Sequence, residues 1–320
     1  MRTIFLTGIT GTLGSKIAEL AVENGDKVIG LIRTKSTVQG PVHPSIQLVE
    51  GGLFSELSPF LYGVDIIIHA AAETRQSRIK YRAYNKINVE ATALLFQTAV
   101  KCKVKQFIYV STANTVWSKS TSVIVDKLAP MPSQFVASYY ARSKYAAEKY
   151  LYYHRHLMNI LIVNPTFIIG SAASLRSSNT IITRVWRKPV IFVPPGGKNF
   201  VSVTEVAESI LTHQGNQSGF IKKLIAGQNL SYEDFYKKFL EVSNQRSLLI
   251  KIPYPILSLL GYFGDTLRRL RVQTSLCSMN MKLVSSYNYY PTNNIPSSAQ
   301  YKTLDSAIEE IINKLKTLQS

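Results

Sequence analysis

Residues 2–25 read RTIFLTGITGTLGSKIAELAVENG, and this stretch decides the fold. It begins with a short apolar run, passes through a glycine-rich turn and continues into a segment where Ile17, Leu20 and Ala21 recur at helical spacing. The closing glycine stands where glycine commonly ends a helix, and a second apolar run, KVIGLI, follows at residues 27–32. The order strand, turn, helix, strand predicts a βαβ unit.

The glycines of the turn follow the spacing T-G-x-x-G-x-x-G, at Gly8, Gly11 and Gly14. The first permits the tight turn, the second lets a pyrophosphate approach the backbone, and the third lets the helix pack closely on the strand. The helix N-terminus then faces the phosphates, so the motif predicts a dinucleotide-binding site. The residues expected to contact the cofactor here are Gly8, Thr10, Gly11, Thr12, Leu13 and Gly14.

The end of the second strand indicates which dinucleotide is bound. NAD-binding folds usually place an Asp or Glu about twenty residues after the glycines, to hold the ribose hydroxyls. This strand instead ends in LIRTK, and Arg33 with Lys35 is suited to a 2′-phosphate. The sequence therefore favours NADP(H), with NAD(H) as the alternative if these two residues are ordinary surface cations.

A second informative stretch, SYYARSKYAAEKY, occupies residues 138–150. Its four-residue step places Tyr140 and Lys144 on one face of a predicted helix. A free tyrosine has a pKa of about 10, but a nearby ammonium favours the phenolate and makes proton exchange with a substrate feasible near neutral pH. Such a pair alone is usually a solvated helix face, whereas beside a dinucleotide site it predicts an acid/base device.

The composition is typical of an enzyme with a substantial core. The chain has 320 residues, of which 46% are hydrophobic, and no apolar run approaches the about 20 residues of a transmembrane helix. No secretory signal is visible, so a cytoplasmic location is expected. Cys102 and Cys277 suit a reducing compartment, and neither they nor the five histidines show metal-ligand spacing, so no metal is expected.

The chain is strongly basic, with 37 Lys and Arg against 19 Asp and Glu, a net charge of +18. Such a field favours an anionic cofactor or substrate. The cations are spread along the chain and no nucleic-acid-binding motif accompanies them, so no specific nucleic-acid partner is expected.

Strand and helix patterns alternate through the first half of the chain. They predict an α/β fold with a doubly wound parallel sheet, and a dinucleotide-binding domain at residues 1–165. After Pro165 the order loosens, which predicts a smaller substrate-binding or lid region at residues 166–320. Within it, the stretch at about 199–227 is expected to return to the main sheet.

Several motifs recur in a characteristic order: TGITGTLG at 7–14, HAAAE at 69–73, NVEAT at 88–92, YVST at 109–112, YARSK at 140–144, NPTFIIG at 164–170 and GGKNFVSVTEVA at 196–207. Together they resemble the extended short-chain dehydrogenase/reductases, which include nucleotide-sugar epimerases, dihydroflavonol reductases and 3β-hydroxysteroid dehydrogenases. The resemblance spans nearly the whole chain and implies a Rossmann-type sheet.

The resemblance also implies roles for individual residues. Tyr140 is the expected acid/base group, and Lys144 is expected to lower its pKa and bind the nicotinamide ribose. Thr112 is expected to polarise the substrate oxygen, with Ser111 as its rival, unless both hydroxyls only satisfy backbone groups. Further residues expected along the cofactor are Ala70, Ala71, Ala72, Asn88, Tyr140, Lys144, Pro165, Thr166 and Phe167, of which Asn88 is expected to fix the sheet or a water.

Three positions depart from the family pattern. Gly52 stands where an Asp commonly contacts the adenine, and Asn164 where an Arg often precedes the proline. Lys198 stands near the place where the epimerases usually carry an Arg for the substrate pyrophosphate. These departures weaken the resemblance to the sugar-nucleotide enzymes, whereas Arg33 and the apolar segment IPYPILSLLGYFGDTLRRL at 252–270 resemble the reductase and hydroxysteroid branch.

The segment 253–271 carries an apolar helical stripe with arginines beside it. The stripe consists of Ile256, Leu259, Leu260, Phe263, Leu267 and Leu270. Packing against the protein or lining of an apolar pocket is the expectation, and contact with an anionic membrane surface is the alternative.

The sequence thus predicts an NADP(H)-dependent oxidoreductase that interconverts a secondary alcohol and a ketone, with a small-molecule substrate of apolar or anionic character. The alternatives are an epimerase or dehydratase acting through a transient keto intermediate, and a non-catalytic NAD(P)-binding sensor. The resemblance implies a homodimer paired through the helices at 88–102 and 139–156. The second helix carries more aromatic surface than one core face can bury, at Tyr145, Tyr150, Leu151, Tyr152 and Tyr153.

Overall fold

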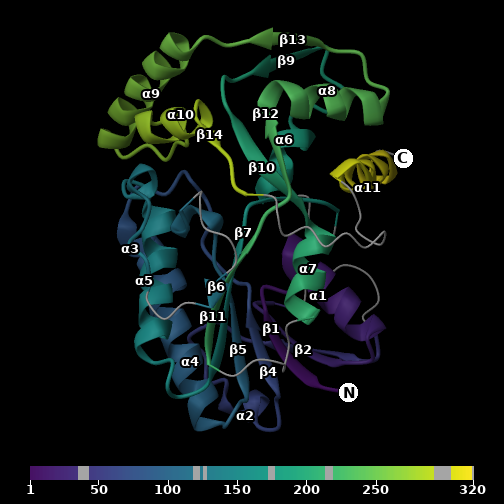
Figure 1. The fold of residues 1–320 in the computed structure, drawn as a ribbon, viewed down its shortest axis with the longest axis vertical. Coiled ribbons are helices and arrows are strands. Elements are labelled where there is room, and N and C mark those ends of the chain that lie inside the picture. The colour runs from purple at the N-terminus through teal and green to yellow at the C-terminus, as the bar shows by residue number, and fades with distance from the viewer. Residues whose placement is uncertain are drawn as a thin grey trace.

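The computed structural model describes residues 1–34, 43–117, 123–124, 128–171, 177–212, 219–291 and 304–318. A parallel sheet with helices on both faces forms one end of the molecule, and smaller sheets with the C-terminal helices form the other (Figure 1). The predicted α/β fold with a doubly wound sheet is confirmed.

The main sheet has eight strands, of which seven are parallel and β6 is antiparallel at the edge. After β3 the chain crosses to β4 on the other side of β1, so the direction of the strand order reverses between the neighbouring strands β1 and β4. Ligands bind beyond the carboxyl ends of the strands at such a switch point. In spatial order the strands are β3 (Ile46–Glu50), β2 (Lys27–Ile32), β1 (Thr3–Thr7), β4 (Ile66–His69), β5 (Gln106–Val110), β7 (Asn159–Pro165), β11 (Phe220–Ile225) and β6 (Val123–Ile124).

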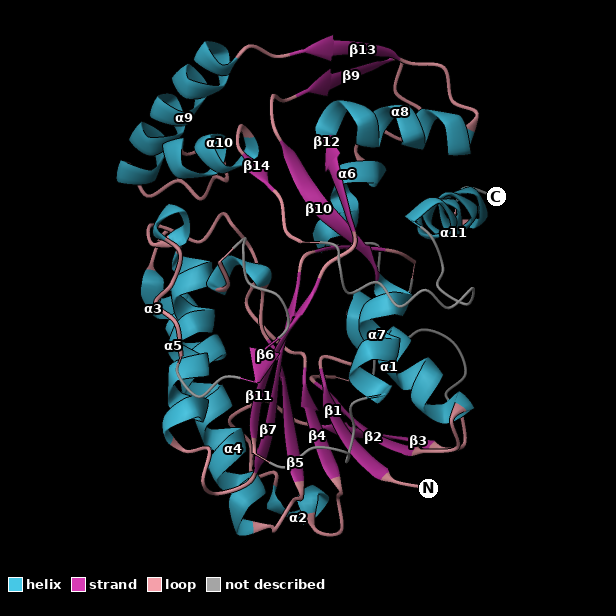
Figure 2. Ribbon diagram, in the orientation of Figure 1, coloured by secondary structure: helices cyan, strands magenta, loops and turns pink. Residues whose placement is uncertain are grey.

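Helices cover both faces of this sheet (Figure 2). One face carries α1 (Thr12–Glu23) and α7 (Val203–Thr212), which pack on each other. The other face carries α2 (Ser58–Leu61), α3 (Tyr81–Tyr84), the π-helix η2 (Asn85–Glu90), α4 (Ala91–Lys101) and α5 (Tyr139–Tyr153). Short 3₁₀ turns, η3 (Ala113–Thr115), η4 (Ser133–Phe135) and η5 (Ser177–Asn179), lie in the connections.

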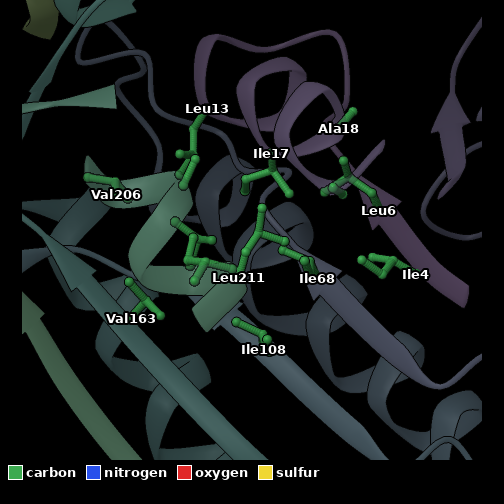
Figure 3. Packing of buried hydrophobic residues seen from close by; sticks show 14 of the residues in the cluster. Ile4, Leu6, Leu13, Ile17, Ala18, Ile68, Ile108, Val163, Val206 and Leu211 are labelled. Atoms are coloured by element: carbon green, nitrogen blue, oxygen red, sulfur yellow. The ribbon is translucent and has the colours of Figure 1, made fainter. Parts of the chain in front are cut away.

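Successive side chains of each strand point to opposite faces of the sheet, and both faces are buried. Ile4, Leu6 and Ile68 point toward α1 and α7, as Figure 3 shows, and Phe5 and Ile67 point toward the helices of the opposite face. This two-sided burial explains why the strands read as continuous apolar runs in the sequence.

The C-terminal region has a core of its own, in which aromatic side chains such as Phe200, Phe235 and Phe239 meet Ile308 and Ile311. Its strands form two small sheets: β8 (Phe167–Ile169), β10 (Gly197–Ser202), β12 (Gln228–Ser231) and β14 (Tyr287–Asn288) in one, and β9 (Val190–Val193) with β13 (Leu248–Lys251) in the other. Its helices are α6 (Thr180–Thr183), α8 (Tyr232–Ser243), α9 (Tyr254–Arg269), α10 (Ser278–Val284) and α11 (Leu304–Thr317).

The chain passes between the two regions more than once. After β10 in the small sheet, α7 packs on α1, and β11 pairs with β7 in the main sheet. The stretch at about 199–227 therefore begins in one region and ends in the other.

Helix α9 differs from the sequence expectation. Its buried residues are Leu257, Gly261 and Gly264, whereas most of its large apolar stripe is exposed. A Cβ on Gly264 would lie 1.3 Å from the Leu276 carbonyl oxygen, so the neighbouring backbone lies directly against the glycine face. Packing of the apolar stripe against the protein was the wrong expectation, because the glycines give closer contact than the large side chains can.

Within the described ranges, no helix combines the length and the apolar character needed to cross a bilayer.

Candidate active site

The glycine turn follows β1, and its backbone conformation and close contacts can be accommodated only by glycine. Gly8 has φ of +78°, and a Cβ there would lie 2.8 Å from the Ala71 nitrogen. A Cβ on Gly14 would lie 2.1 Å from the Gly8 carbonyl oxygen, so α1 packs directly on the turn. Within the described residues, the one close neighbour of a Cβ on Gly11 would be the Gly8 oxygen, at 3.2 Å, so the described chain leaves space on that side for a ligand.

Helix α1 begins at this turn without a side-chain cap and without an acidic residue in its first turn. Its first amide groups are therefore oriented to bind an anion. The turn, the open side of Gly11 and the bare helix end fit the pyrophosphate of a dinucleotide. Thr10 lies in this turn, and Thr12 and Leu13 begin α1, so contact of these three residues with the cofactor stays a prediction.

Ala70, Ala71 and Ala72 follow β4 and lie partly exposed beside Gly8. The Ala71 amide donates to the Thr7 hydroxyl at 3.2 Å, which fixes this loop against the glycine turn. The neighbouring strands thus bring together two segments that both were expected to contact the cofactor.

His69 supports the junction of the glycine turn and the loop after β4. It was not among the site residues that the sequence predicted. Its Nδ1 lies 2.7 Å from the Thr7 hydroxyl and its Nε2 lies 3.0 Å from the Thr92 hydroxyl. Since the Thr92 hydroxyl donates to the Asn88 carbonyl, it accepts from Nε2, and Nδ1 accepts from Thr7. Complete burial lowers the pKa of His69 to about 3, so the ring is neutral and structural.

Arg33 lies exposed just beyond β2, and no carboxylate in the described chain forms an ion pair with it. Lys35 lies outside the described residues. Gly52, at the neighbouring strand end, uses its amide to donate to the Ser55 hydroxyl at 2.8 Å. Within the described chain, the Arg33 guanidinium therefore has no acidic partner at this end of β2.

Tyr140 lies in the first turn of α5, which Ser138 caps by accepting from the Ala141 amide at 3.3 Å. Burial raises the pKa of the Tyr140 phenol to about 12, and a hydrogen bond with the Thr112 side chain acts in the opposite direction. The structure therefore brings Tyr140 and Thr112 together, as the resemblance implied.

Lys144 lies one turn further along α5 and is almost completely buried. Its ammonium donates to the Val110 carbonyl at 2.6 Å and lies 4.2 Å from the centroid of the Tyr109 ring. Burial lowers the pKa of Lys144 to about 7, and the Glu148 charge acts in the opposite direction. The expectation that Lys144 lowers the pKa of Tyr140 is not met, because desolvation of the phenol dominates and the ammonium is directed at Val110 and Tyr109.

Ser111 and Thr112 have different surroundings. The buried Ser111 hydroxyl donates to Glu148 Oε1 at 2.5 Å, so it is held away from the phenol. Glu148 is fully buried and also accepts from Thr115 Oγ1 at 2.7 Å and Asn164 Nδ2 at 2.8 Å. The Thr112 hydroxyl lies outside this network and beside Tyr140.

Asn88 is buried and fully engaged. Its Oδ1 accepts from the Glu73 amide at 2.8 Å, and its Nδ2 donates to the Glu73 carbonyl at 3.1 Å and to Ser143 Oγ at 2.9 Å. Asn88 thus clamps the loop after β4 to α5, which agrees with a fixing role. Both polar atoms of the Asn88 side chain are therefore engaged within the described chain.

Pro165, Thr166 and Phe167 connect β7 to β8. The Thr166 hydroxyl donates to Asn199 Oδ1 at 2.7 Å, and Lys198 Nζ lies 4.5 Å from the centroid of the Phe167 ring. Burial lowers the pKa of Lys198 to about 8. A cation therefore lies where the small sheet meets the end of the main sheet.

A cavity of about 540 Å³ opens between the loop after β4, the start of α5 and the end of α9. Tyr84, whose hydroxyl donates to the Arg75 carbonyl at 2.5 Å, forms its wall next to Ser138 and Tyr139. The cations that line it are Arg78, Lys80, Arg268, Arg269 and Arg271, and Asp265 is the acidic residue among its lining side chains. The sequence showed the arginines of α9 but did not place them at a pocket.

Arg268 closes one side of this cavity. Its Nη2 donates to the Gln76 carbonyl at 2.6 Å and to the Thr274 carbonyl at 2.7 Å, which ties α9 to the loop after β4. Arg78 forms an ion pair with Glu73 at 3.2 Å. Lys80, Arg269 and Arg271 form no ion pair with the described part of the chain.

Known proteins are similar to this chain in sequence and in fold. The chain is 24% identical over 248 residues to a decarboxylating sterol-4-alpha-carboxylate 3-dehydrogenase of Dictyostelium discoideum, covering 74% of this chain and 75% of that one. It is 27% identical over 206 residues to a putative dihydroflavonol 4-reductase of Synechocystis, covering 63% and 60%.

Among solved structures, the Bordetella bronchiseptica enzyme WbmH in complex with NAD⁺ has the same fold. It superimposes with a TM-score of 0.71 at 19% sequence identity, over 99% of this chain and 98% of that one. Residues 4–212 match the family model described as the NAD-dependent epimerase/dehydratase family. These residues contain the glycine turn, Thr112, Tyr140 and Lys144, and the chain therefore belongs to the NAD-dependent epimerase/dehydratase family.

Proposed function

We propose that the protein is an NADP(H)-dependent oxidoreductase that interconverts a secondary alcohol and a ketone. One observation carries the proposal: the Tyr140 phenol lies beside the Thr112 side chain at the carboxyl end of β5, close to the switch point where the glycine turn lies. A phenol and a hydroxyl at this place can hold one substrate oxygen between them.

In the proposed reaction the nicotinamide, when bound, supplies or accepts the hydride at the substrate carbon. Thr112 donates a hydrogen bond to the substrate oxygen, and Tyr140 passes the proton to or from that oxygen. Lys144, which donates to the Val110 carbonyl from the same helix as Tyr140, is proposed to hold the nicotinamide ribose. Asn88 acts indirectly by fixing the loop Ala70–Ala72 that faces the glycine turn.

For the cofactor, we propose that Arg33 pairs with the 2′-phosphate of NADP(H), with Lys35 beside it in the sequence. The exposed guanidinium at the end of β2 and the absence of a carboxylate at that strand end support this choice. NAD⁺ is the ligand in the similar WbmH structure, so NAD(H) is the alternative that the experiment must separate.

For the substrate, we propose a small molecule that carries an anionic group besides its hydroxyl or carbonyl. The cavity beside Tyr84 and Tyr139 supports this, because Lys80, Arg269 and Arg271 line it without an ion pair to the described chain. Guanidinium groups bind carboxylates and phosphates through two parallel hydrogen bonds.

Epimerisation through a keto intermediate is the second candidate, and Lys198 favours it. This half-buried cation beside Phe167 could bind a substrate pyrophosphate where the family usually has an arginine. The two candidates differ in cofactor balance, because a reductase consumes NADPH whereas an epimerase returns it.

The test is hydride transfer from NADPH or NADH to a panel of ketones with and without carboxylate or phosphate groups. The loss of the absorbance of the reduced cofactor measures the transfer. Stoichiometric loss of NADPH with an anionic ketone is the expected result. Binding of NADPH without turnover of any panel member would instead identify a non-catalytic sensor.

We also propose a cytoplasmic homodimer paired through α4 and α5, although the aromatic argument for it is weaker than the sequence suggested. Tyr150 stacks on His154 at 4.2 Å, Tyr152 packs against Phe220 and Leu151 is buried, so chiefly Tyr153 is left exposed. Light scattering that gives a particle of 35.8 kDa, the monomer mass, would contradict the dimer.

A further inference from the structure

The exposed apolar face of α9 is unusual for a helix in a globular protein. Leu259, Tyr262 and Phe263 are 71%, 66% and 59% exposed. Since a helix advances about 100° per residue, these side chains lie roughly opposite the packed Leu257 and Gly261. A surface helix normally buries its apolar stripe, whereas α9 directs it into solvent.

The same end of the molecule exposes the outer face of the β9–β13 sheet. Phe192 pairs with Ile250 across the two strands, and Leu248 lies two residues away on the same face. The opposite face of this sheet packs into the core over α8 through Ile191 and Leu249. Figure 1 shows α9, β9 and β13 along one end, away from the chain's N-terminus. We call this surface the apolar end; it consists of Phe192, Leu248, Ile250, Ile256, Leu259, Leu260, Tyr262, Phe263 and Leu270.

Cations surround the apolar end. Between residues 244 and 272 the chain has five basic residues and one acidic residue, Asp265. The nearby Glu233 is already paired with Lys237 and Lys251. The exposed cations that form no ion pair with the described chain are Arg187 and Lys188 before β9, Arg246 before β13, and Arg269 and Arg271 at the end of α9.

We propose that the apolar end docks onto the surface of an anionic lipid bilayer. Helix α9 lies in the plane of the interface, with Leu259, Phe263 and Leu270 among the acyl chains, while Arg187, Lys188 and Arg246 meet the lipid phosphates. A second copy of this chain fits less well, because pairing through this end would bring like charges together. The helix has 16 residues and is suited to lie on a bilayer rather than to cross it.

The experiment is co-sedimentation of the full chain with vesicles of phosphatidylcholine alone or of phosphatidylcholine with phosphatidylglycerol. The wild type should sediment with the anionic vesicles, and added salt should weaken this binding. Leu259→Ser/Phe263→Ser should lower the partition by at least about tenfold, because two apolar anchors are lost. Lys188→Gln/Arg246→Gln should lower it by about thirtyfold on the anionic vesicles, since each cation near the surface contributes about 1 kcal/mol.

The matched control is Tyr62→Ser/Leu157→Ser, which removes two exposed apolar side chains outside the apolar end. It should bind as the wild type does, and all variants should keep the wild-type thermal unfolding because the changed side chains are exposed. Failure of the wild type to sediment, equal binding to both vesicle types, or wild-type binding by Leu259→Ser/Phe263→Ser would overturn the proposal. So would light scattering in which that variant converts a dimer into monomers, since the apolar end would then join two copies of the chain.

Discussion

Lys222 of β11 donates to Glu148 of α5 at 2.7 Å, which joins the last parallel strand of the sheet to the helix that carries Tyr140 and Lys144. Glu148 is fully buried and Lys222 is 11% exposed, so the pair is largely removed from water. Through Asn164 and Thr115, both bonded to Glu148, the pair also supports the Thr112 backbone, whose carbonyl accepts from Asn164 at 2.9 Å. The proposed catalytic groups at the end of β5 are thus supported by a charge pair behind them.

Removal of one partner should therefore destabilise the protein strongly. Breaking a buried pair typically costs about 3–5 kcal/mol, because the remaining charge is left without compensation. Glu148→Leu should lower the free energy of unfolding by about this amount, as measured by urea denaturation. Lys149→Gln, a change at the exposed neighbouring residue, should have little effect. Glu148→Leu/Lys222→Met should recover part of the loss. Equal unfolding midpoints for Glu148→Leu and Lys149→Gln would show that the pair does not stabilise the fold.

Tyr140→Phe should abolish turnover and leave NADPH affinity nearly unchanged, because the phenol hydroxyl handles the proton and contributes little to ground-state binding. Tyr145→Phe is the matched control, since the Tyr145 hydroxyl lies on the same helix but donates to the Ala129 carbonyl. Steady-state rates and calorimetric titration of the cofactor measure both effects. Retention of most activity by Tyr140→Phe would remove Tyr140 from the acid/base role.

Arg33→Ala should weaken NADPH binding by roughly ten- to a hundredfold, as expected for the loss of a charge-assisted contact worth about 1.5–3 kcal/mol. NADH has no phosphate at that place and should bind as before. Lys27→Ala, at the other end of β2, is a control for the general loss of one surface charge. Parallel losses for NADPH and NADH would mean that Arg33 is an ordinary surface cation.

At alkaline pH, the amine of Lys144 should take up a proton when the cofactor binds. Burial places the pKa of Lys144 at about 7 in the structure, so the free protein holds this amine mostly neutral at pH 8. An anionic dinucleotide favours the ammonium, so affinity should fall as pH rises above about 7, by up to about tenfold per pH unit. Titration calorimetry in buffers of different ionisation enthalpy measures the uptake. Lys144→Met should bind more weakly and take up no proton; an unchanged uptake would assign it to another group.

Stability should fall as pH decreases from 7 to 5 because of His69. Burial lowers the pKa of His69 to about 3, so in this window the unfolded chain binds a proton that the native protein does not. The native state therefore loses up to about 2 kcal/mol between pH 7 and pH 5 from this residue. In urea denaturation, the stability of His69→Gln should depend less on pH than that of the wild type. The stability of the exposed control His43→Gln should depend on pH as the wild type does. An unchanged slope in His69→Gln would place the effect elsewhere.

Local patterns in the sequence determined the βαβ unit, the glycine turn and the helix with Tyr140 and Lys144 on one face. Turn chemistry and helical spacing act over a few residues, so they can be recognised along the chain. The alternation of strands and helices also predicted the doubly wound sheet, since parallel strands need such crossovers.

Tertiary structure alone decided the features that join distant segments. It paired Glu148 with Lys222, placed Ser111 in that buried network, and gathered the arginines of α9 with Arg78 around a cavity. It also reversed two expectations. Burial raised the pKa of Tyr140, because desolvation depends on everything packed around the phenol. The contact of Gly264 with the backbone at Leu276 turned the apolar stripe of α9 outward, because helical spacing defines a stripe but only the neighbouring chain decides which face is covered.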